Sequence, residues 1–504
     1  MENKKFNNNQ PVLTLQEQTR IRIEKIDKLK EKGVAPFGAK FDVKDKICDI
    51  KANYLDIEKE ELEAKNVKAT IAGRIITKRD MGKIAFCNLQ DRDGNIQIYI
   101  RKDVIGEEAY SVFKLSDLGD IIGVTGDVMK TNTGELSIKV TEYTHLTKAL
   151  RPLPEKYHGL QDVEERYRRR YVDLIVNEQS RKTAIARTRI VREMQNYFDS
   201  LGFIEVETPC LTGVLTGASA RPFITHHNTL DRDYYLRIAT ELPLKRLLVG
   251  GLERVYEFGR LFRNEGMDTK HSPEFTTVEL YQAFGDLRSM MELCETSFKR
   301  IAKNVFNGQE EFEWNGHVIN VAKPFKVVAM VDLVKEVTGI DFNEITSFEQ
   351  AKQLADEREL FVPNHFTTVG HILNLFFEEY CEKTLIQPTF LTRHPVEISP
   401  LTKVCEDDPR YVDRFELFIA GCEFANAYSE LNDPIDQRER FVKQLEEKNL
   451  GNDEAGDIDN DFLEALEYGM PPAGGIGIGV DRLVMFFTGS SSIRDVILFP
   501  LMKD

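Results

Sequence analysis

The sequence predicts an α+β protein with a small antiparallel β-barrel near its N-terminus and a larger domain built on an antiparallel sheet flanked by helices. Three observations favour this fold class. Residues 67–147 form short β-rich runs with turn signals between them, a charged amphipathic segment precedes these runs, and the rest of the chain mixes helical and β-rich segments in no regular βαβ order. The length of 504 residues gives room for more than one domain.

The segment before the barrel, residues 14–37, predicts a capped amphipathic helix that begins after Thr14 and ends at Gly33. In the β-rich region that follows, Asp93-Gly94 and Thr133-Gly134 are typical of hairpin turns, and the strand spacing fits a barrel of about five strands. Barrels of this kind often bind oligonucleotides on one face, although many do not. The barrel alone therefore leaves nucleic-acid binding open.

The formal net charge of −16 is unevenly distributed along the chain. Residues 1–150 carry 26 Lys and Arg against 24 Asp and Glu, a net charge of +2, so the other 354 residues carry −18. A polyanionic partner would have to bind through local patches, because the global field repels it. The seven cysteines are scattered without a Cys-x-x-Cys pair, which indicates neither a disulfide framework nor a zinc site. With no long apolar run and no signal core at the N-terminus, we expect a cytoplasmic protein without membrane contact.

A dense basic run, Arg166 and Arg168 to Arg170, follows the barrel. It predicts either a solvated helix face or a patch that contacts a phosphate backbone. The next helix carries an apolar stripe at spacings of three and four residues, formed by Val191, Met194, Phe198 and Leu201. We therefore divide the chain into a helical extension (1–65), a barrel (66–148), a linker (149–178) and a large domain (179–504).

The stretch FGRLFRNEGMDTKHSPEFTTVELYQAF, residues 258–284, concentrates charged and aromatic side chains on two expected strands. Arg263 and Glu265 share a face of the first strand, and alternate residues from Phe275 to Tyr281 share a face of the second. If these faces coincide, a guanidinium for phosphate, a phenyl ring for a purine and carboxylates for an amine converge on one floor. These groups suit a site that holds ATP beside an amine. The alternative is an ion-pair network on the surface of a sheet.

Three carboxylates, Glu416, Glu423 and Glu430, recur at intervals of seven in another β-rich segment, where Glu423 and Glu430 fall on opposite faces of the expected strand. Carboxylates that face a shared pocket suit Mg²⁺ bridging phosphates, although an isolated Glu is usually solvated. The glycine-rich run GGIGIGVDRLVMFF, residues 474–487, fits neither a dinucleotide-binding nor a Walker motif. Its glycines let a strand backbone lie close to a ligand, and Arg482 after them could offer a second guanidinium to a polyphosphate.

These segments resemble the motifs of the class II aminoacyl-tRNA synthetases. FRNEG followed by HSPEFTTVELY looks like motif 2, GIGIGVDRLVMFF looks like motif 3, and the helix leading into GFIEVETPCL looks like motif 1. The similarity to the lysine-specific, bacterial-type members continues through GASARPFITHHN, ELPLKRLLVGG, RHPVEISPL, SELNDPIDQ and RDVILFP. The resemblance implies an OB-fold barrel and a class II catalytic domain that forms lysyl-adenylate from L-lysine and ATP. It also implies transfer of the lysine to tRNA(Lys).

The resemblance implies roles for matching residues of the site. Arg263 and Arg482 are the implied catalytic residues, at the α-phosphate and the γ-phosphate. The implied ATP-binding residues are Arg263, Glu265, Lys270, His271, Phe275 and Arg482, with Phe275 stacked on adenine. Mg²⁺ would bind Glu416 and Glu423. The implied lysine-binding residues are Gly217, Glu241, Glu279, Tyr281, Asn426, Tyr428 and Glu430, and the implied anticodon-binding residues are Lys78, Arg79, Phe86, Gln97 and Glu135.

The expected pocket suits lysine better than aspartate or asparagine, the substrates of relatives with the same architecture. An ε-ammonium has three donors and no acceptor, which Glu279, Tyr281 and Glu430 would satisfy, whereas aspartate would face like charges. Departures from the common pattern at Thr216, at Lys270 and in ANAYSE bear on affinity rather than identity. The two alternatives are an aspartyl- or asparaginyl-specific relative and an inactive RNA-binding relative.

Two further expectations concern partners and the barrel. The motif 1 resemblance implies a homodimer in which the striped helix and the strand up to Pro209 form a two-fold interface. The alternative is a helix packed inside its own subunit. Phe86 is expected either to stack on an RNA base or to pack in the barrel core.

Overall fold

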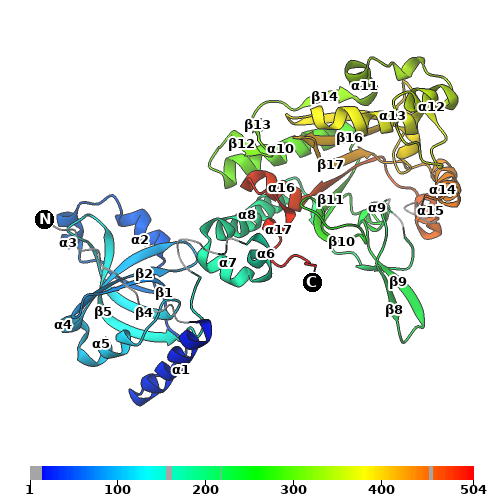
Figure 1. Cartoon of the computed structure of the whole chain (residues 1–504). Coiled ribbons are helices and arrows are strands. Elements are labelled where there is room, and N and C mark those ends of the chain that lie inside the picture. The colour runs from blue at the N-terminus through cyan, green and yellow to red at the C-terminus, as the bar shows by residue number, and fades with distance from the viewer. Residues whose placement is uncertain are drawn as a thin grey trace. The chain divides into compact units, whose positions relative to one another are not determined.

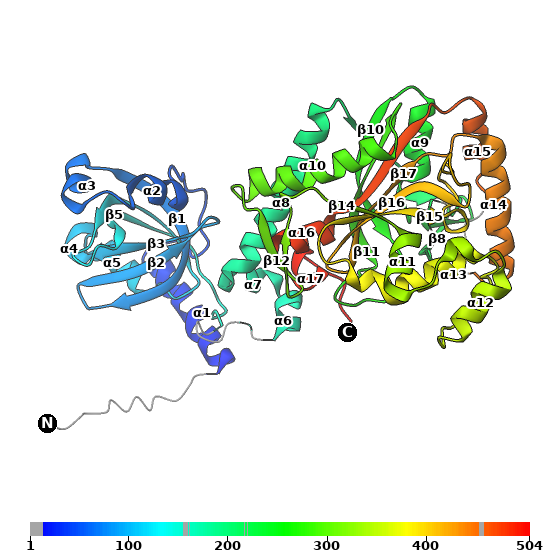
Figure 2. The same cartoon turned by 90° about the horizontal axis from the view of Figure 1, so that it is seen from above.

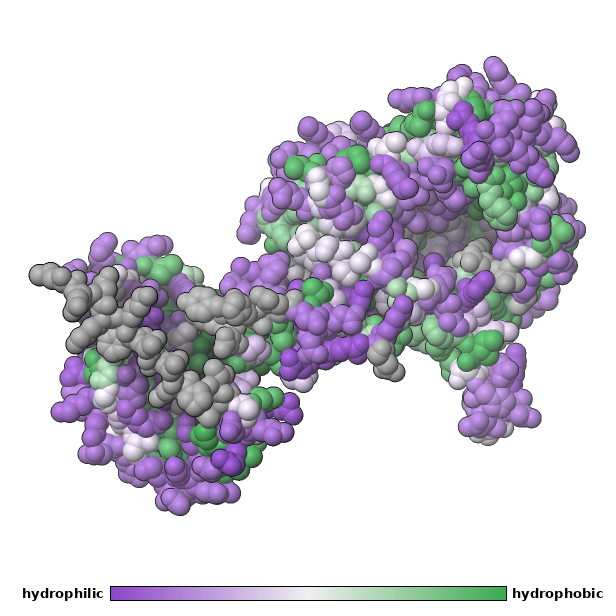
Figure 3. Space-filling view, in the orientation of Figure 1, coloured by the Kyte–Doolittle hydropathy of each residue, from purple (hydrophilic) through white to green (hydrophobic). Residues whose placement is uncertain are grey.

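The computed structural model describes residues 14–154, 160, 162–215, 217–218, 220–452 and 458–503, so Thr216 lies outside the described residues. The chain divides into two compact units, residues 1–161 and 162–504, shown in Figure 1. The range that we assigned to a linker, 149–178, spans this boundary and contains two helices of the second unit. Within the described residues, no helix is long and apolar enough to cross a membrane. The surface visible in Figure 3 is mostly hydrophilic, with smaller hydrophobic patches.

The first unit is a closed five-stranded barrel with helices around it, as the sequence predicts, but it is not wholly antiparallel, because β3 and β5 pair in parallel. Its strands follow the order β1-β2-β3-β5-β4, and β4 pairs with β1 to close the barrel. The expected turns at Asp93-Gly94 and Thr133-Gly134 join β2 to β3 and β4 to β5. The elements are α1 (Leu15–Glu31), α2 (Ile47–Tyr54), α3 (Lys59–Lys65), β1 (Lys68–Asp80), β2 (Ile84–Gln90), β3 (Asn95–Arg101), α4 (Lys102–Ile105), α5 (Glu107–Lys114), β4 (Ile121–Lys130) and β5 (Leu136–Thr147).

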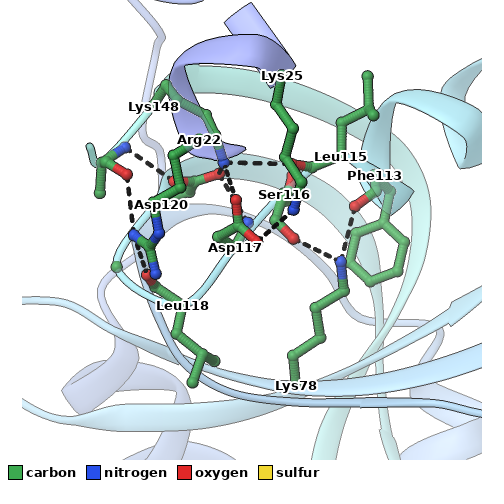
Figure 4. A network of polar contacts seen from close by, with 12 residues as sticks. Arg22, Lys25, Lys78, Phe113, Leu115, Ser116, Asp117, Leu118, Asp120 and Lys148 are labelled. Carbon is green, nitrogen blue, oxygen red and sulfur yellow. Dashed lines mark hydrogen bonds and ion pairs between the residues drawn. The ribbon is translucent and has the colours of Figure 1, made fainter. Parts of the chain in front are cut away.

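Helix α1 begins and ends where the sequence predicts. Thr14 and Glu17 form a reciprocal capping box, and Gly33 just after the helix has a φ of 71°. Figure 4 shows how the helix is attached to the barrel. Arg22 donates to the backbone carbonyls of Leu118, Ala149 and Arg151 at 2.9–3.2 Å, and Lys25 Nζ lies 2.6 Å from Asp117 Oδ1. Polar contacts over long sequence separations therefore fix α1 to its unit.

The second unit is built on an eight-stranded sheet of order β14-β15-β16-β17-β18-β11-β10-β6. Its strand pairs are antiparallel except β14 with β15 and β10 with β6, which confirms the predicted α+β class. The strands are β6 (Ile204–Glu205), β7 (Leu211–Thr212), β8 (Ile224–His227), β9 (Arg232–Leu236), β10 (Arg254–Phe262), β11 (Glu274–Ala283), β12 (Glu311–Trp314), β13 (His317–Asn320), β14 (Lys326–Ala329), β15 (Thr389–Pro395), β16 (Tyr411–Ile419), β17 (Cys422–Ser429) and β18 (Ala473–Gly479). Strands β7, β9 and β8 form a separate small sheet, and β12 pairs with β13.

Helices cover the large sheet, as Figures 1 and 2 show. Helices α8, α10 and α16 pack together on one side of it, whereas α9 contacts β10, β11 and α15. The helices are α6 (Val163–Arg168), α7 (Arg170–Val176), α8 (Glu178–Ser200), α9 (Glu241–Val249), α10 (Leu287–Val305), α11 (Met330–Thr338), α12 (Phe348–Asp356), α13 (Val369–Phe376), α14 (Pro434–Asn449), α15 (Asn460–Glu467), α16 (Val480–Thr488) and α17 (Ile493–Val496). The described residues also contain a π-helical turn, η2 (Phe377–Cys381). The 3₁₀ turns among them are η1 (Phe342–Glu344), η3 (Glu382–Thr384) and η4 (Val396–Ile398).

The apolar stripe of α8 packs inside its own unit. Met194 and Phe198 are 1% and 0% exposed and belong to the main core, and Val191 and Leu201 pack against the same core. The stripe therefore faces the core of its own unit, where the sheet and α10 pack against it, and a two-fold interface through the rest of α8 stays a prediction. The strand that follows is also shorter than expected, since β6 contains two residues. The homodimer itself stays a prediction.

The basic run 166–170 is divided: Arg168 and Arg169 are partly exposed and pair with Glu164 and Glu165, as a solvated face would have it, whereas Arg166 and Arg170 turn inward. Arg170 is 1% exposed, pairs with Asp173 at 2.8 Å and donates to the backbone carbonyls of Arg494 and Leu498 at 2.6 and 3.0 Å. Arg166 also pairs with Asp173, at 2.9 Å. These arginines attach α6 and α7 to the C-terminal segment, because a buried guanidinium needs both a counter-charge and acceptors for its donors.

Candidate active site

A cavity of about 740 Å³ opens in the second unit above β11, β16, β17 and β18. Fourteen of the fifteen residues expected for ATP, lysine and metal line it: Gly217, Glu241, Arg263, Glu265, Lys270, His271, Phe275, Glu279, Tyr281, Glu416, Glu423, Asn426, Tyr428 and Arg482. The predicted convergence of the 258–284 stretch is therefore confirmed, but the expectation that Arg263 and Glu265 share a strand face is wrong, because β10 ends at Phe262 and both residues follow it. The fifteenth, Glu430, lies behind Gly475, where any added side chain would collide with the Glu430 carboxylate and the Tyr281 ring.

The hairpin β10–β11 positions the guanidinium of Arg263 over the ring of Phe275. The two strands pair in register, with Leu261 opposite Phe275, and the Arg263 amide donates to Pro273 O at 2.9 Å just beyond the strand ends. The Arg263 guanidinium carbon lies 5.2 Å from the Phe275 ring centroid. Its Nε is buried and has no hydrogen-bond partner among the described residues. A buried donor without an acceptor is costly, so this arginine is arranged for an anion that enters the cavity.

The loop between these strands brings exposed polar groups to the cavity. Glu265, Lys270 and His271 all lie on it and are exposed. Asp268 orders the loop by accepting hydrogen bonds from the backbone amides of Lys270 and His271 at 2.6 and 2.7 Å, and its other oxygen lies 2.9 Å from His271 Nδ1. On the opposite side, Arg482 in α16 donates to the backbone carbonyl of Glu423. The cavity therefore has cationic groups at more than one wall.

The other end of the cavity is acidic and buried. Glu279 on β11 accepts hydrogen bonds from Tyr281 Oη at 3.0 Å and from the Thr240 amide at 3.1 Å. Glu241, at the start of α9, accepts a hydrogen bond from Tyr428 Oη at 2.6 Å. Burial, and then the nearby charge of Glu241, raise the pKa of Glu279 above its ordinary value. This end of the cavity therefore favours a cationic ligand, whose charge would relieve the repulsion.

Lys245 is part of this acidic end, although sequence reasoning missed it. Its side chain is fully buried, and its Nζ lies 2.6 Å from Glu241 Oε1 and also pairs with Glu430. Burial alone would lower the pKa of Lys245, but the two carboxylates raise it above its ordinary value. The spacing of four residues from Glu241 is the local signal that could have revealed this pair.

A second cluster of carboxylates, formed by Glu416 and Glu423, lies on β16 and β17. Glu416 is held by Arg414 Nη2 at 2.6 Å, and its other oxygen lies 3.5 Å from His394 Nε2. Burial would raise the pKa of Glu416, but the Arg414 charge and His394 lower it to about 2. Burial and then the charge of Glu416 raise the pKa of the neighbouring Glu423 carboxyl to about 7. Two neighbouring carboxylates whose negative charges repel each other attract a cation.

The residues present fit a Mg²⁺ ion that also binds phosphates. Within the described parts of the chain, no group of three or more His, Cys, Asp or Glu is arranged to hold a metal by itself. Mg²⁺ usually binds through one or two carboxylates, with waters and substrate phosphates as the other ligands. Glu416 and Glu423 supply that number. Glu378 and Glu382, on and just after the π-helical turn η2, add negative charge to the same wall.

Arg414 links the cluster at Glu416 to the amino-acid end of the cavity. Its Nε donates to Asn426 Oδ1 at 3.0 Å, and its Nη1 donates to Ser399 Oγ at 2.9 Å and Ile398 O at 3.1 Å. Gly217, on the wall near Glu241, has a φ of 90°. That conformation favours glycine, and an added Cβ would also lie only 3.2 Å from the Ala239 Cβ.

The barrel of the first unit presents a row of side chains across β1, β2 and β3. Arg79, Phe86 and Tyr99 are cross-strand neighbours, and the Phe86 and Tyr99 rings stack with centroids 4.8 Å apart. Phe86 is half-buried and lies outside the barrel core, whereas its chain neighbours Ala85 and Cys87 point into that core. The alternative that Phe86 is a core residue is therefore wrong. Tyr99 was missed by sequence reasoning, although its place two residues after Gln97 puts both on one face.

The other expected RNA-facing residues of the barrel have different surroundings. Glu135 is exposed in the β4–β5 turn, and Gln97 Oε1 accepts a hydrogen bond from Ser137 Oγ at 2.9 Å. Lys78 points the other way from Arg79, and its Nζ donates to Phe113 O and Ser116 O at 3.0 and 2.7 Å, as Figure 4 shows. Its ammonium is thus already engaged at the end of α5. The role of Lys78 toward RNA stays a prediction.

Each of the two units matches the model of a known protein family. Residues 162–503 match the model of the tRNA synthetases class II (D, K and N), and residues 69–146 match the OB-fold nucleic acid binding domain. The second unit, with its mixed, mainly antiparallel sheet and its cavity, thus has the class II synthetase fold, and the first unit is an OB-fold.

Curated relatives resemble the chain over nearly its whole length. It is 57% identical to the lysine--tRNA ligase of Lactococcus lactis subsp. cremoris (strain MG1363), over 97% of this chain and 99% of the relative. The lysine--tRNA ligases of Bacillus subtilis (strain 168) and Streptococcus sanguinis (strain SK36) are each 56% identical, over 97% of this chain and 98% of theirs. The chain belongs to the lysine--tRNA ligase family of class II tRNA synthetases.

Proposed function

We infer that the protein is a lysine--tRNA ligase. It activates L-lysine with ATP to lysyl-adenylate, then transfers lysine to the 3′-terminal adenosine of tRNA(Lys), releasing AMP and pyrophosphate. The observation that carries this inference is the buried acidic end of the cavity, formed by Glu241, Glu279 and two phenols, in the same cavity as the Arg263 guanidinium. Full-length similarity to lysine--tRNA ligases supports it.

In the first step the lysine carboxylate attacks the α-phosphorus of ATP and pyrophosphate leaves. We propose that Arg263 binds the α-phosphate and the lysine carboxylate, because it lines the cavity and its buried Nε has no hydrogen-bond partner in the described part of the chain. The Phe275 ring, already stacked under this guanidinium, would hold the adenine. Arg482 would bind the γ-phosphate, and Glu265, Lys270 and His271 would border the nucleotide from the loop. No covalent bond to the protein is needed, so rate enhancement comes from positioning and charge neutralisation.

We propose that Glu416 and Glu423 hold Mg²⁺ together with phosphate oxygens of ATP. When bound there, the ion neutralises phosphate charge and assists departure of pyrophosphate. Arg414 and His394 fix the Glu416 carboxylate in the ionised form that a metal ligand needs. The raised pKa of the Glu423 carboxyl agrees with a site that contains too much negative charge without a cation.

In the second step a ribose hydroxyl of the terminal adenosine attacks the adenylate carbonyl, and AMP leaves. For lysine itself, we propose that Glu279 and Tyr281 receive the ε-ammonium, that Glu430 adds negative charge from behind Gly475, and that Glu241, Asn426, Tyr428 and Gly217 complete the pocket. A buried carboxylate set would repel the side chain of aspartate. We also propose a homodimer and, because the relatives are bacterial enzymes that act on tRNA, a cytoplasmic location.

The substrate assignment is tested by amino-acid-dependent exchange of pyrophosphate into ATP. We expect exchange with L-lysine and none above background with L-aspartate or L-asparagine, because only lysine brings a second ammonium to the acidic end. Equal exchange with aspartate would overturn the lysine assignment. No exchange with any of the three would favour an inactive RNA-binding relative.

The barrel face carries a separate prediction about tRNA. We propose that Phe86 stacks on an anticodon base, with Tyr99 beside it and Arg79 near the backbone. Stacking is worth about 1–3 kcal/mol per base by alanine substitution, so Phe86→Ala should lower kcat/KM for tRNA by roughly tenfold or more. Lysine-dependent pyrophosphate exchange, which needs no tRNA, should stay within about twofold of the wild type.

Phe37→Ala is the control for this prediction. Phe37 is 57% exposed in the same unit and pairs with the end of β5, outside the row of Arg79, Phe86 and Tyr99. We expect aminoacylation by this variant to match the wild type. Unchanged aminoacylation by Phe86→Ala would exclude Phe86 from the RNA site. Loss of both aminoacylation and exchange, with a lower Tm, would show instead that Phe86 stabilises the barrel.

A further inference from the structure

The protein places a cation of its own in the wall of the amino-acid pocket. Lys245 is 0% exposed, pairs with both Glu241 and Glu430, and lies with its Nζ 5.4 Å from the ring centroid of Tyr428. Glu241 Oε1 accepts hydrogen bonds from Lys245 Nζ and Tyr428 Oη, both at 2.6 Å. The ammonium thus contacts three residues proposed to bind lysine, without lining the cavity itself.

The charges of the pocket suggest why an internal ammonium is needed. Three buried carboxylates, Glu241, Glu279 and Glu430, face one internal ammonium, and burying unpaired charges is costly. With all three carboxylates ionised, the protein alone would lack two positive charges. Burial raises the pKa of Glu430 to about 8 even with Lys245 beside it, so a proton on Glu430 meets part of this shortage. L-Lysine carries two ammonium groups, whereas aspartate and asparagine carry one each.

We propose that Lys245 is a positioning residue for amino-acid recognition. It holds Glu241 and Glu430 in place and limits the unmatched negative charge of the pocket to two, the number of ammonium groups that the substrate supplies. This inference rests on the proposed lysine specificity. Without Lys245, a third carboxylate would lack a counter-charge, and the pocket would have to take up a proton or rearrange before lysine could bind.

The test compares Lys245→Met with the wild type in pyrophosphate exchange. Methionine keeps the length of the side chain and removes its charge. We expect the KM for lysine to rise by about 10- to 100-fold, the range typical of residues that orient a binding group. The KM for ATP and kcat at saturating lysine should stay within about twofold, because Arg263, Phe275 and Arg482 are untouched.

Lys182→Met is the matched control. Glu178 and Lys182 form an ion pair at the same i, i+4 spacing on α8, but both side chains are about two-thirds exposed. We expect it to leave both KM values unchanged. If Lys245→Met does not fold, Lys245→Gln takes its place, since an amide still donates a hydrogen bond but carries no charge.

The outcomes separate this inference from the proposed function. Failure of the wild type to use lysine would contradict the proposed function itself. If the wild type uses lysine, an unchanged lysine KM in Lys245→Met, or equal increases of the lysine and ATP KM values, would overturn the role of Lys245 alone. If neither Lys245→Met nor Lys245→Gln folds, Lys245 acts in stability, and its proposed role in positioning is likewise overturned.

Discussion

Replacing Arg263 by alanine is expected to lower kcat/KM for lysine-dependent pyrophosphate exchange by about 100- to 1,000-fold, the effect of removing one preorganised donor from a developing oxyanion. The guanidinium rests on Phe275 in the wall of the cavity, and its Nε has no hydrogen-bond partner among the described residues, so an entering anion would displace no protein acceptor there. Its removal takes away the group proposed to hold the α-phosphate and the lysine carboxylate together. Exchange rates over a range of lysine concentrations at saturating ATP give kcat/KM and measure the loss.

Arg260→Ala is the control for this variant. Arg260 lies on the same strand, is about half exposed, and faces Glu274 at 3.6 Å. Exposed pairs of this kind contribute little to stability, so we expect normal exchange. Circular dichroism and Tm should show that Arg263→Ala is folded. A folded Arg263→Ala variant with nearly normal exchange would contradict the proposed adenylation site.

Replacing Glu279 by glutamine is expected to cause the second largest loss, and one confined to the amino acid. Glutamine can still accept from the Thr240 amide and contact Tyr281 Oη, so the change removes charge but little shape. Removing one partner of a buried charge pair costs about 2–5 kcal/mol, which lowers kcat/KM for lysine by roughly 30-fold or more. The KM for ATP should change little.

Glu274→Gln provides the comparison for Glu279→Gln. Glu274 begins the same strand, but its side chain is about half exposed and its charge lies on the surface. The Glu274→Gln variant should have the same kcat/KM for lysine as the wild type. If Glu279→Gln were to activate lysine normally, the ε-ammonium would have to be bound by other groups, and the proposed pocket would be wrong.

Local patterns predict much of the fold and the floor of the site. The capping residue Thr14, the turns at Asp93-Gly94 and Thr133-Gly134, and the period-two alternation from Phe275 to Tyr281 each act within a few residues. Because side chains two residues apart on a strand share a face, the floor of the cavity follows from the β11 sequence once its pairing with β10 is assumed.

Contacts between distant segments could not be predicted in this way. The stripe on α8 has the same spacing whether it meets a second copy or its own sheet, and only the fold shows that Phe198 is in the core. Arg170 looks like part of a surface run until the C-terminal segment supplies its acceptors. Lys78 and Lys245 likewise have partners that only tertiary packing brings close. Their positive charge alone does not reveal that Lys78 donates to backbone carbonyls or that Lys245 is buried beside Glu430.

Strand β18 has a consequence for the order in which the enzyme can become active. Strands β11 and β17 carry Glu279, Tyr281, Asn426 and Tyr428 of the proposed lysine pocket and do not pair with each other; β18 lies between them and pairs with both. Translation makes this joining strand after both of them, and long-range pairing forms slowly. A chain cut short before residue 473 would contain Arg263, Glu279 and Glu423 but no assembled floor. Incomplete products would therefore neither consume ATP nor charge tRNA.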